Sequence, residues 1–205
     1  MGQFACTTTL ARLSLRPPGR LLRTLGHRSN GPFRGGKRDI YEGGHRVPFF
    51  IRWPSGIQQP GRNYDGLVCQ TDLLASFAEL LECELDAGAG EDSQSFASVF
   101  MDATSLHQRL PLISHDARGR FSITDGRWKL VMPFRKLEAE LYDLAADPSE
   151  SDNIYAEHPD RAAELTEKIT QIVCRGRTTA GPSVPNDTGY WSDLAWMSSS
   201  EYPAN

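Results

Sequence analysis

The residues best suited to bind an oxyanion gather in one glycine-rich segment over residues 35–48, GGKRDIYEGGHRVP. Two glycine pairs flank Lys37, and His45 follows the second pair. Glycine pairs let the backbone approach a bound group closely and adopt conformations that side chains forbid. A lysine held there is a fixed positive charge, which suits sulfate or phosphate. The segment predicts an anion contact at Lys37, with an ordinary solvated loop lysine as the simpler alternative.

Two histidines are further candidates. His45 could hold a proton or contact substrate, but a histidine beside two glycines could equally orient the loop by a hydrogen bond. His115 lies in the sequence Ser114-His115-Asp116, which has the residue types of a catalytic triad. Neighbouring residues of a strand point to opposite faces, so these three cannot form a triad among themselves. His115 therefore stays a candidate substrate contact, and its spacing from His107 is not that of metal ligands.

Composition limits the possible functions. Of the 205 residues, 39% are hydrophobic and 23% are charged, as in an ordinary globular protein. No run of about 18 apolar residues occurs, so no membrane span is expected. Residues 1–38 carry eight Lys or Arg and no acid. Because this basic stretch has few aromatic residues and no known binding motif, we expect no nucleic-acid partner.

Apolar periodicity predicts the elements before residue 110. Residues 47–53 read as a buried strand. Apolar residues at helical spacing indicate a helix over about 71–83, with Thr71 as its N-cap. Cys69 and Cys83 flank this helix and are expected to be small buried apolar residues. Residues 1–26 are expected to be disordered or foreign to the fold.

A small sheet is expected in the second half of the chain. Its strands are predicted at about 110–114, 120–124, 127–131 and 140–144. Asp125-Gly126 is typical of a hairpin turn, and the alternating strands favour an antiparallel sheet with one face in water. Apolar residues from Pro159 to about Cys174 indicate a helix over the apolar face. The tail carries Trp191 and Trp196, which could border a sugar or aryl site or simply bury apolar surface.

Three segments together resemble the arylsulfatase-type sulfatases. The first is residues 35–48 with the apolar run after it. The second, over 121–130, has the pattern F-x-I-x-D-G-x-W-K-L. The third is ELYDL at 140–144, which continues through Asp147-Pro148 and Glu150 to Asn153. Their order and spacing also match the family from about Gly26 to Trp196.

The resemblance implies an incomplete α/β fold of the alkaline-phosphatase-like sulfatase class. Residues 27–109 would be a remnant of the catalytic domain and its main sheet. Residues 110–205 would form a subdomain with an antiparallel sheet, a helix and an aromatic tail. Lys37 matches the family lysine that contacts the substrate sulfate. Complete members hydrolyse sulfate esters of small molecules or carbohydrates, use a calcium ion, and are often periplasmic, secreted or lysosomal; no clear signal peptide is present here.

Two family features are not found in this sequence. No Cys or Ser stands in the C/S-x-P-x-R motif that gives the formylglycine nucleophile, and the aspartate segments that bind calcium are absent. We therefore expect no metal ligands in this chain and no sulfatase activity from it alone. The alternatives are a non-catalytic truncated remnant with no independent role, and a relative that acts on phosphate esters.

Overall fold

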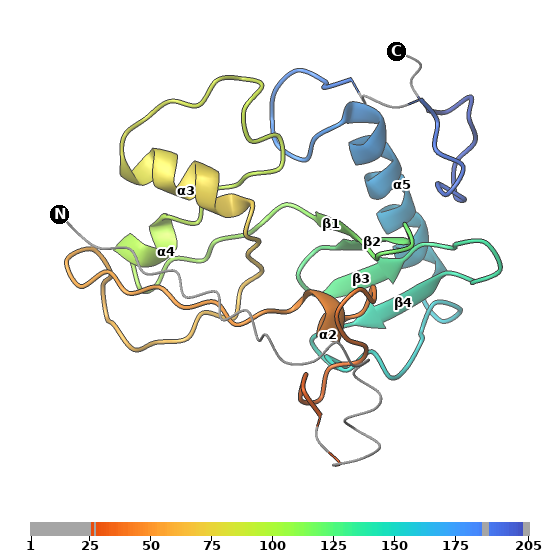
Figure 1. Cartoon of the computed structure of the whole chain (residues 1–205), viewed down its shortest axis with the longest axis horizontal. Helices are drawn as coiled ribbons and strands as arrows, with labels where there is room; N and C mark the ends of the chain where they lie inside the picture. Colours follow the sequence, from red (N-terminus) through yellow and green to blue (C-terminus); the bar gives the residue numbers. More distant parts are fainter. Residues whose placement is uncertain (1–25, 27, 186–188, 203–205) are drawn as a thin grey trace.

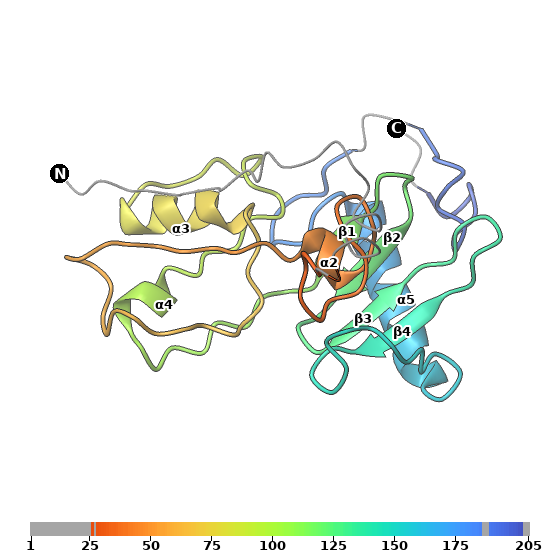
Figure 2. The same cartoon turned by 60° about the horizontal axis from the view of Figure 1, so that its bottom comes forward.

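The structure is a computed structural model that describes residues 26, 28–185 and 189–202. The basic segment expected over residues 1–26 lies, apart from Gly26, outside the described residues. In chain order the helices and strands are α2 (Glu42–His45), α3 (Asp72–Leu80), α4 (Ser98–Met101), β1 (Leu112–His115), β2 (Phe121–Thr124), β3 (Trp128–Val131), β4 (Glu140–Asp143) and α5 (Pro159–Arg175). Figures 1 and 2 show α3 and α4 at one end of the molecule, and the sheet with α5 at the other.

The four strands form one antiparallel sheet in which each strand pairs with the next along the chain. The β2–β3 hairpin closes where the Asp125 N–H donates to the Trp128 carbonyl at 3.1 Å. The Asp125 carboxylate also accepts the Trp128 N–H at 2.8 Å. Gly126 has a φ of 97°, which glycine adopts without strain. The predicted sheet and its hairpin are therefore confirmed.

Helix α5 covers one face of this sheet, as predicted. The buried side chains of this core are Ile123, Leu130, Met132, Leu141, Ala162, Leu165 and Ile169. Pro159 stands in the first turn, where its missing N–H costs nothing. The helix ends at Gly176, whose left-handed φ of 72° lets its N–H donate to the Ile172 carbonyl. The apolar stripe of the helix therefore fixes it on the sheet.

The other face of the sheet is not in water, so that prediction is wrong. Ser122, Lys129 and Tyr142 lie on this face and are at most 2% exposed. The chain over residues 34–46 covers it, and Ile40 packs against Tyr142. Alternation of polar and apolar residues indicates which side chains share a face. It does not reveal that another segment supplies partners for the polar ones.

The strand expected over residues 47–53 is not formed. This segment has no regular secondary structure, and Figure 2 shows it as an extended run that leaves α2. A strand requires a neighbour with which to exchange hydrogen bonds, and none pairs with it among the described residues. Its inward side chains pack on a second apolar cluster around Phe96, Val99 and Phe100. Cys83, predicted to be buried, is exposed.

A buried ion pair holds the first turn of α3. Asp72 accepts hydrogen bonds from the Arg109 guanidinium at 2.7 and 2.9 Å, and both side chains are fully buried. The Asp72 carboxylate also accepts the Cys69 N–H at 2.7 Å. Thr71 is the N-cap residue, as predicted, but its side chain makes no capping hydrogen bond. The carboxylate of Asp72, the first residue of the helix, instead bonds the turn before the helix and a cation from a distant segment.

The aromatic tail packs on the sheet-and-helix part, as expected. Trp191 and Trp196 each meet the Phe121 ring edge-on, with centroids 5.5 and 5.6 Å away. The Trp196 indole N–H donates to the Thr170 hydroxyl on α5 at 3.2 Å. Among the described helices, none has the length and apolar character needed to cross a bilayer.

We predict that Ile169→Ala lowers the free energy of unfolding by about 2–5 kcal/mol, because it leaves a cavity between α5 and the sheet. Glu167→Ala changes an exposed position of the same helix and should stay within about 0.5 kcal/mol of the parent. Urea unfolding followed by circular dichroism measures both. Equal effects of the two substitutions would contradict the assignment of the core.

Candidate active-site segment

A tight turn presents Lys37 to solvent. The Asp39 carboxylate accepts the Gly36 N–H at 2.9 Å, and the Asp39 N–H donates to the Gly36 carbonyl at 2.9 Å. Lys37 lies exposed within this turn. Arg38 has a φ of 86°, a strained conformation for a non-glycine residue, and its carbonyl accepts the Ala117 N–H at 3.1 Å. The turn is therefore held in place by the β1–β2 loop.

The second glycine pair serves the packing of the loop on itself. The Gly43 N–H donates to the Arg34 carbonyl at 2.8 Å. A Cβ on Gly43 would lie 2.5 Å from that carbonyl oxygen, and one on Gly44 would lie 2.1 Å from the Asp39 carbonyl oxygen. Side chains at either position would force the loop apart. Close approach was predicted for these glycines, but the group that approaches them is the chain's own backbone.

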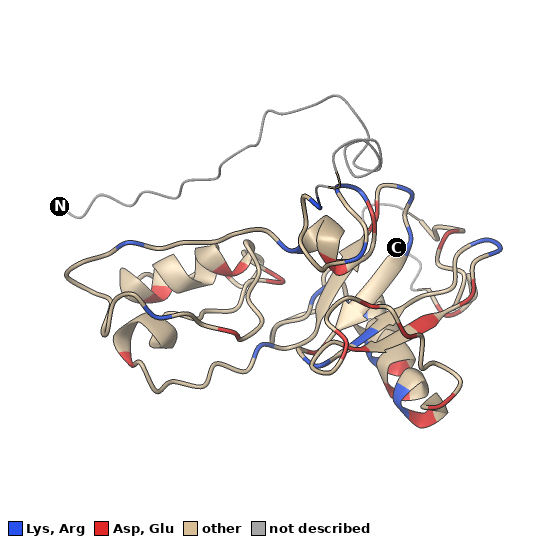
Figure 3. Cartoon of the chain, turned by 90° about the horizontal axis from the view of Figure 1, so that it is seen from below, with Lys and Arg blue, Asp and Glu red and all other residues tan. Residues whose placement is uncertain are grey.

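The three candidate residues surround the β1–β2 loop. Lys37 precedes the residue that bonds Ala117, His115 ends β1, and His45 ends α2. His115 is exposed, and its Nδ1 lies 2.9 Å from the Asp116 carbonyl oxygen. His45 is also exposed, near enough to His115 for one charge to influence the other. Figure 3 shows Lys and Arg gathered around α2 and the neighbouring turn.

The pKa of His45 lies below its ordinary value. Although the side chain is exposed, the surrounding chain removes part of the water around the imidazole, and this desolvation is the largest cause of the lowered pKa. The positive charges of Lys129 and His115 also oppose protonation. Glu42 and Asp116 act in the opposite direction without cancelling these effects. An ordinary histidine has a pKa of about 6.5, so His45 is mainly neutral at neutral pH. A neutral imidazole there can accept or donate a hydrogen bond without adding charge to the site.

A buried lysine supports this loop from below. Lys129 Nζ, on β3, lies 2.8 Å from Glu150 Oε1 and 3.1 Å from Glu42 Oε1. The other oxygen of Glu150 accepts the Glu42 N–H at 2.6 Å, at the start of α2. Lys129 and Glu150 are almost completely removed from water. One cation thus joins the sheet, the glycine-rich segment and the chain after β4.

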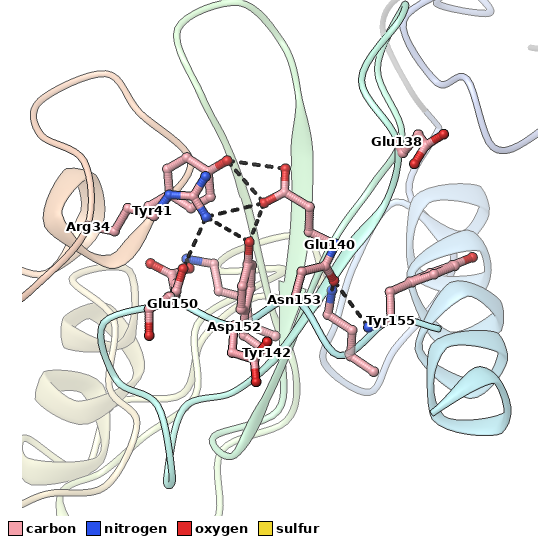
Figure 4. Close-up of polar contacts among 12 residues, drawn as sticks. Arg34, Tyr41, Glu138, Glu140, Tyr142, Glu150, Asp152, Asn153 and Tyr155 are labelled. Carbon is pink, nitrogen blue, oxygen red and sulfur yellow. Dashed lines mark hydrogen bonds and ion pairs between the residues drawn. The ribbon is translucent and has the colours of Figure 1, made fainter. Parts of the chain in front are cut away.

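A second polar cluster lies beside the first, around Glu140 of β4 (Figure 4). Its carboxylate accepts hydrogen bonds from the hydroxyls of Tyr41 and Tyr142 and from Arg120 Nη1, the last at 2.8 Å. Arg34 Nη1 donates to the Tyr142 hydroxyl at 2.8 Å and to the Glu150 carbonyl at 3.1 Å. These contacts fix the beginning of the glycine-rich segment to the edge of the sheet.

The two clusters shift the pKa values of their carboxyl groups in opposite directions. Burial raises the pKa of Glu150 and outweighs the opposing influence of Lys129. Burial would also raise the pKa of Glu140, but hydrogen bonds from Tyr142 and Arg120 outweigh it and the pKa is lowered. Burial and hydrogen bonding to Glu140 raise the pKa of Tyr142, so its hydroxyl stays protonated and donates. Glu140 is therefore held as a carboxylate by the groups around it.

The third motif segment is tied to the sheet by Asn153. Its side-chain oxygen accepts the Leu141 N–H at 3.0 Å and the Tyr155 N–H at 3.1 Å. The Ile154 N–H donates to the Leu141 carbonyl at 3.0 Å. Sequence reasoning used Lys129, Glu140, Glu150 and Asn153 only as marks of resemblance. One sequence feature could have indicated the buried network: Lys129 lies between two apolar neighbours in a strand.

The described residues do not fit a calcium ion. Calcium prefers six to eight oxygen ligands, usually with several carboxylates. No group of three or more His, Cys, Asp or Glu side chains in the described part of the chain is arranged to hold a metal. Near Lys37, Asp39 bonds the turn and Glu42 pairs with Lys129. The nearby acids therefore act within the loop.

A sulfatase is among the solved structures with the same arrangement. A Bacteroides thetaiotaomicron structure, a sulfatase from a study of glycosaminoglycan metabolism, aligns at a TM-score of 0.62 and 32% identity. The alignment covers 72% of this chain and 33% of that one. The structure of Ps i-CgsB with k-i-k-neocarrahexaose aligns at 0.62 and 20% identity, over 76% of this chain and 35% of that one, which shows a shared fold. The fold is therefore that of the C-terminal portion of a sulfatase.

The family follows from the sequence comparisons. Residues 33–177 match the model of the family N-sulphoglucosamine sulphohydrolase, C-terminal, and the chain belongs to this sulfatase family. The N-acetylgalactosamine-6-O-sulfatase of Bacteroides thetaiotaomicron is 34% identical over an alignment of 169 residues, and the alignment covers 75% of this chain and 32% of the relative. The steryl-sulfatase of Rattus norvegicus is 42% identical over 57 residues, 28% of this chain and 10% of the relative. The chain thus spans at most about a third of the length of these relatives.

We predict that Lys129→Ala lowers the free energy of unfolding by about 3–5 kcal/mol, because it leaves the buried Glu150 carboxylate without its partner. Lys136→Ala removes an exposed lysine of the β3–β4 connection and should change stability by less than about 0.5 kcal/mol. Urea unfolding of both variants measures the difference. A loss below about 1 kcal/mol for Lys129→Ala would contradict the role of the buried pair.

The lowered pKa of Glu140 predicts a pH dependence. Its contribution to stability is fully present above the pKa that it has in the unfolded chain, about 4.3, and is lost as pH falls through its lower folded pKa. The gap in unfolding free energy between the parent and Glu140→Gln should therefore narrow as pH is lowered from about 6. Glu138→Gln, at an exposed position nearby, is the control and should keep a gap near zero. A gap for Glu140→Gln that widens in acid would have the wrong sign.

Proposed function

We propose that this chain is the C-terminal, substrate-facing portion of a sulfuric ester hydrolase, and that Lys37 contacts the sulfate group. The observation that carries this proposal is the position of Lys37. The residue lies exposed on a strained turn, and an extensive buried polar network supports the loop that carries it. A flexible loop lysine would not require such a support. The membership in a sulfatase family gives the chemistry of the ligand.

The chemical role of Lys37 would be electrostatic. Hydrolysis of a sulfate ester builds negative charge on the leaving oxygen and on the oxygens of the sulfuryl group. A preorganised cation stabilises such charge without reorganisation at the moment of reaction. His45 and His115 are proposed as neighbouring contacts to the alcohol part of the substrate, since both are exposed beside the same loop. A neutral His45 suits a hydrogen bond to a hydroxyl group.

Several features of the complete enzyme are proposals that rest on its relatives. The nucleophile and the calcium ligands would come from sequence that this chain does not contain. A sulfated carbohydrate is the proposed substrate class, because a curated relative that matches 75% of this chain bears the name of a sugar 6-O-sulfatase. Residues 27–109 and 110–205 are proposed as the two structural units, with the glycine-rich segment of the first unit packed on the sheet of the second. The alternative of a non-catalytic truncated remnant with no independent role is not better supported than this proposal.

A chimera tests the proposal. Residues 33–202 of this chain would replace the corresponding part of the N-acetylgalactosamine-6-O-sulfatase of Bacteroides thetaiotaomicron, which would supply the remaining two thirds. We predict sulfate release from a 6-O-sulfated galactosamine by the chimera and none by residues 1–205 alone. Lys37→Ala in the chimera should lower kcat/KM by about 10²- to 10³-fold, the usual cost of a lost preorganised donor.

Lys136→Ala is the matched control, because it removes an exposed lysine far from the glycine-rich segment in the chain. Its kcat/KM should equal that of the parent chimera. A folded, active chimera that loses nothing on Lys37→Ala would overturn the role of Lys37. Release of phosphate rather than sulfate from matched esters would favour the phosphoesterase alternative.

A further inference from the structure

Two turns that share one backbone hydrogen bond carry three exposed cations. Lys37 and Arg38 lie on the first turn, and Arg118 lies in the β1–β2 loop. The Arg38 carbonyl accepts the Ala117 N–H at 3.1 Å, so Arg118 directly follows the residue that makes this contact. Figure 3 shows Lys and Arg gathered around α2 and the neighbouring turn. The proposed sulfate contact at Lys37 therefore has two further cations beside it.

The acidic groups beside these cations bond the backbone instead of the cations. The Asp39 carboxylate accepts the Gly36 N–H at 2.9 Å, and the Asp116 carboxylate accepts the Arg118 N–H at 2.7 Å. Within the part of the chain that the structure describes, none of the three basic side chains forms an ion pair. The exposed Arg127, by contrast, lies 2.7 Å from a carboxylate oxygen of β4. The three charges are therefore available to an anion from outside the chain.

The β1–β2 loop holds the backbone of Arg118 in a defined conformation. The Asp116 carboxylate also accepts the Arg120 N–H at 2.9 Å, and the Gly119 N–H donates to the Asp116 carbonyl at 3.2 Å. Gly119 has a left-handed φ of 92°, and a Cβ there would lie 2.7 Å from the Trp191 ring. A cation on a preorganised turn loses less conformational entropy on binding than one on a mobile loop. The loop is therefore suited to recognise an anion.

We propose that Arg38 and Arg118 form a second anion site, which binds a further anionic group of the substrate beside the sulfate that Lys37 contacts. This inference rests on the proposed function and narrows its substrate to a carbohydrate with at least two anionic groups. A guanidinium binds a sulfate or a carboxylate through two parallel N–H···O bonds, which a lysine cannot do. The chain has a formal net charge of −4, so the attraction of a second anion depends on local cations.

Binding to residues 1–205 tests the second anion site without any catalysis. The probes are N-acetylgalactosamine 6-O-sulfate and N-acetylgalactosamine 4,6-di-O-sulfate, each titrated into isotope-labelled protein and followed by NMR. The disulfated sugar should bind at least about fivefold more tightly, because its second sulfate gains a charge-assisted contact. Arg118→Gln should weaken this preference, and Arg118→Gln combined with Arg38→Gln should abolish it. Arg118→Lys keeps the charge without the planar fork and should retain part of the preference.

Lys136→Gln is the matched control, because it removes an exposed cation of the β3–β4 connection. It should leave the preference for the disulfated sugar unchanged. A third probe, N-acetylgalactosamine 6-O-sulfate joined to a glucuronate, shows whether a carboxylate on the next sugar can replace the second sulfate. Equal affinities of the parent protein for all three probes, or no binding of any of them, would overturn the second anion site. A preference that survives the double substitution would overturn it too.

Kinetics of the chimera separate this inference from the proposed function. Arg118→Gln should lower kcat/KM for the disulfated sugar about tenfold more than for the monosulfated sugar. An equal loss for both sugars would indicate a general effect on the loop and would contradict the second anion site. A binding preference with an inactive chimera would support the second anion site and contradict the proposed hydrolysis. Sulfate release by the chimera with equal affinities for the probes would do the opposite.

Discussion

The buried ammonium of Lys129 is the interaction on which the rest of this structure depends. It lies between Glu150 and Glu42, and these three residues come from β3, from the connection after β4 and from the glycine-rich segment. A buried charge is costly unless it is paired and hydrogen-bonded, so the three segments cannot separate without exposing or stranding it. Because of this constraint, the polar face of the sheet binds one particular loop, the glycine-rich segment.

The network explains why a loop with strained backbone keeps a defined shape. Arg38 adopts a left-handed φ and the glycines of the second pair approach the backbone too closely for a side chain. Such features persist only where the surroundings determine the conformation. Here the surroundings are the carboxylates of Glu42, Glu140 and Glu150 with their partners. The paired carboxylates of the motif segments, such as Glu42 and Glu150, thus position the exposed Lys37.

The two ends of the molecule differ in how completely they bury their apolar residues. At the sheet, α5 and the tail close one face and the glycine-rich segment closes the other. Around α3 and α4, the buried Asp72–Arg109 pair holds the segments together while large apolar side chains stay in contact with water. The glycine-rich segment connects these two ends. The proposed anion site therefore lies between a part of the molecule that buries its large apolar side chains and a part that leaves several of them exposed.

Local patterns in the sequence predict the four-stranded sheet, the hairpin at Asp125, the helix from Pro159 and the glycine-rich segment with Lys37, because periodicity and turn chemistry depend on neighbouring residues. The sequence also carried enough pattern to indicate a sulfatase. It could not show that the strand pattern of residues 47–53 would lack a neighbour among the described residues, since strand pairing depends on residues that are distant in the sequence. Nor could it show that the polar face of the sheet is covered. The support that Lys129, Glu140 and Glu150 give to the loop becomes visible in the folded chain alone, because a charged side chain can be buried only where its partners converge in space.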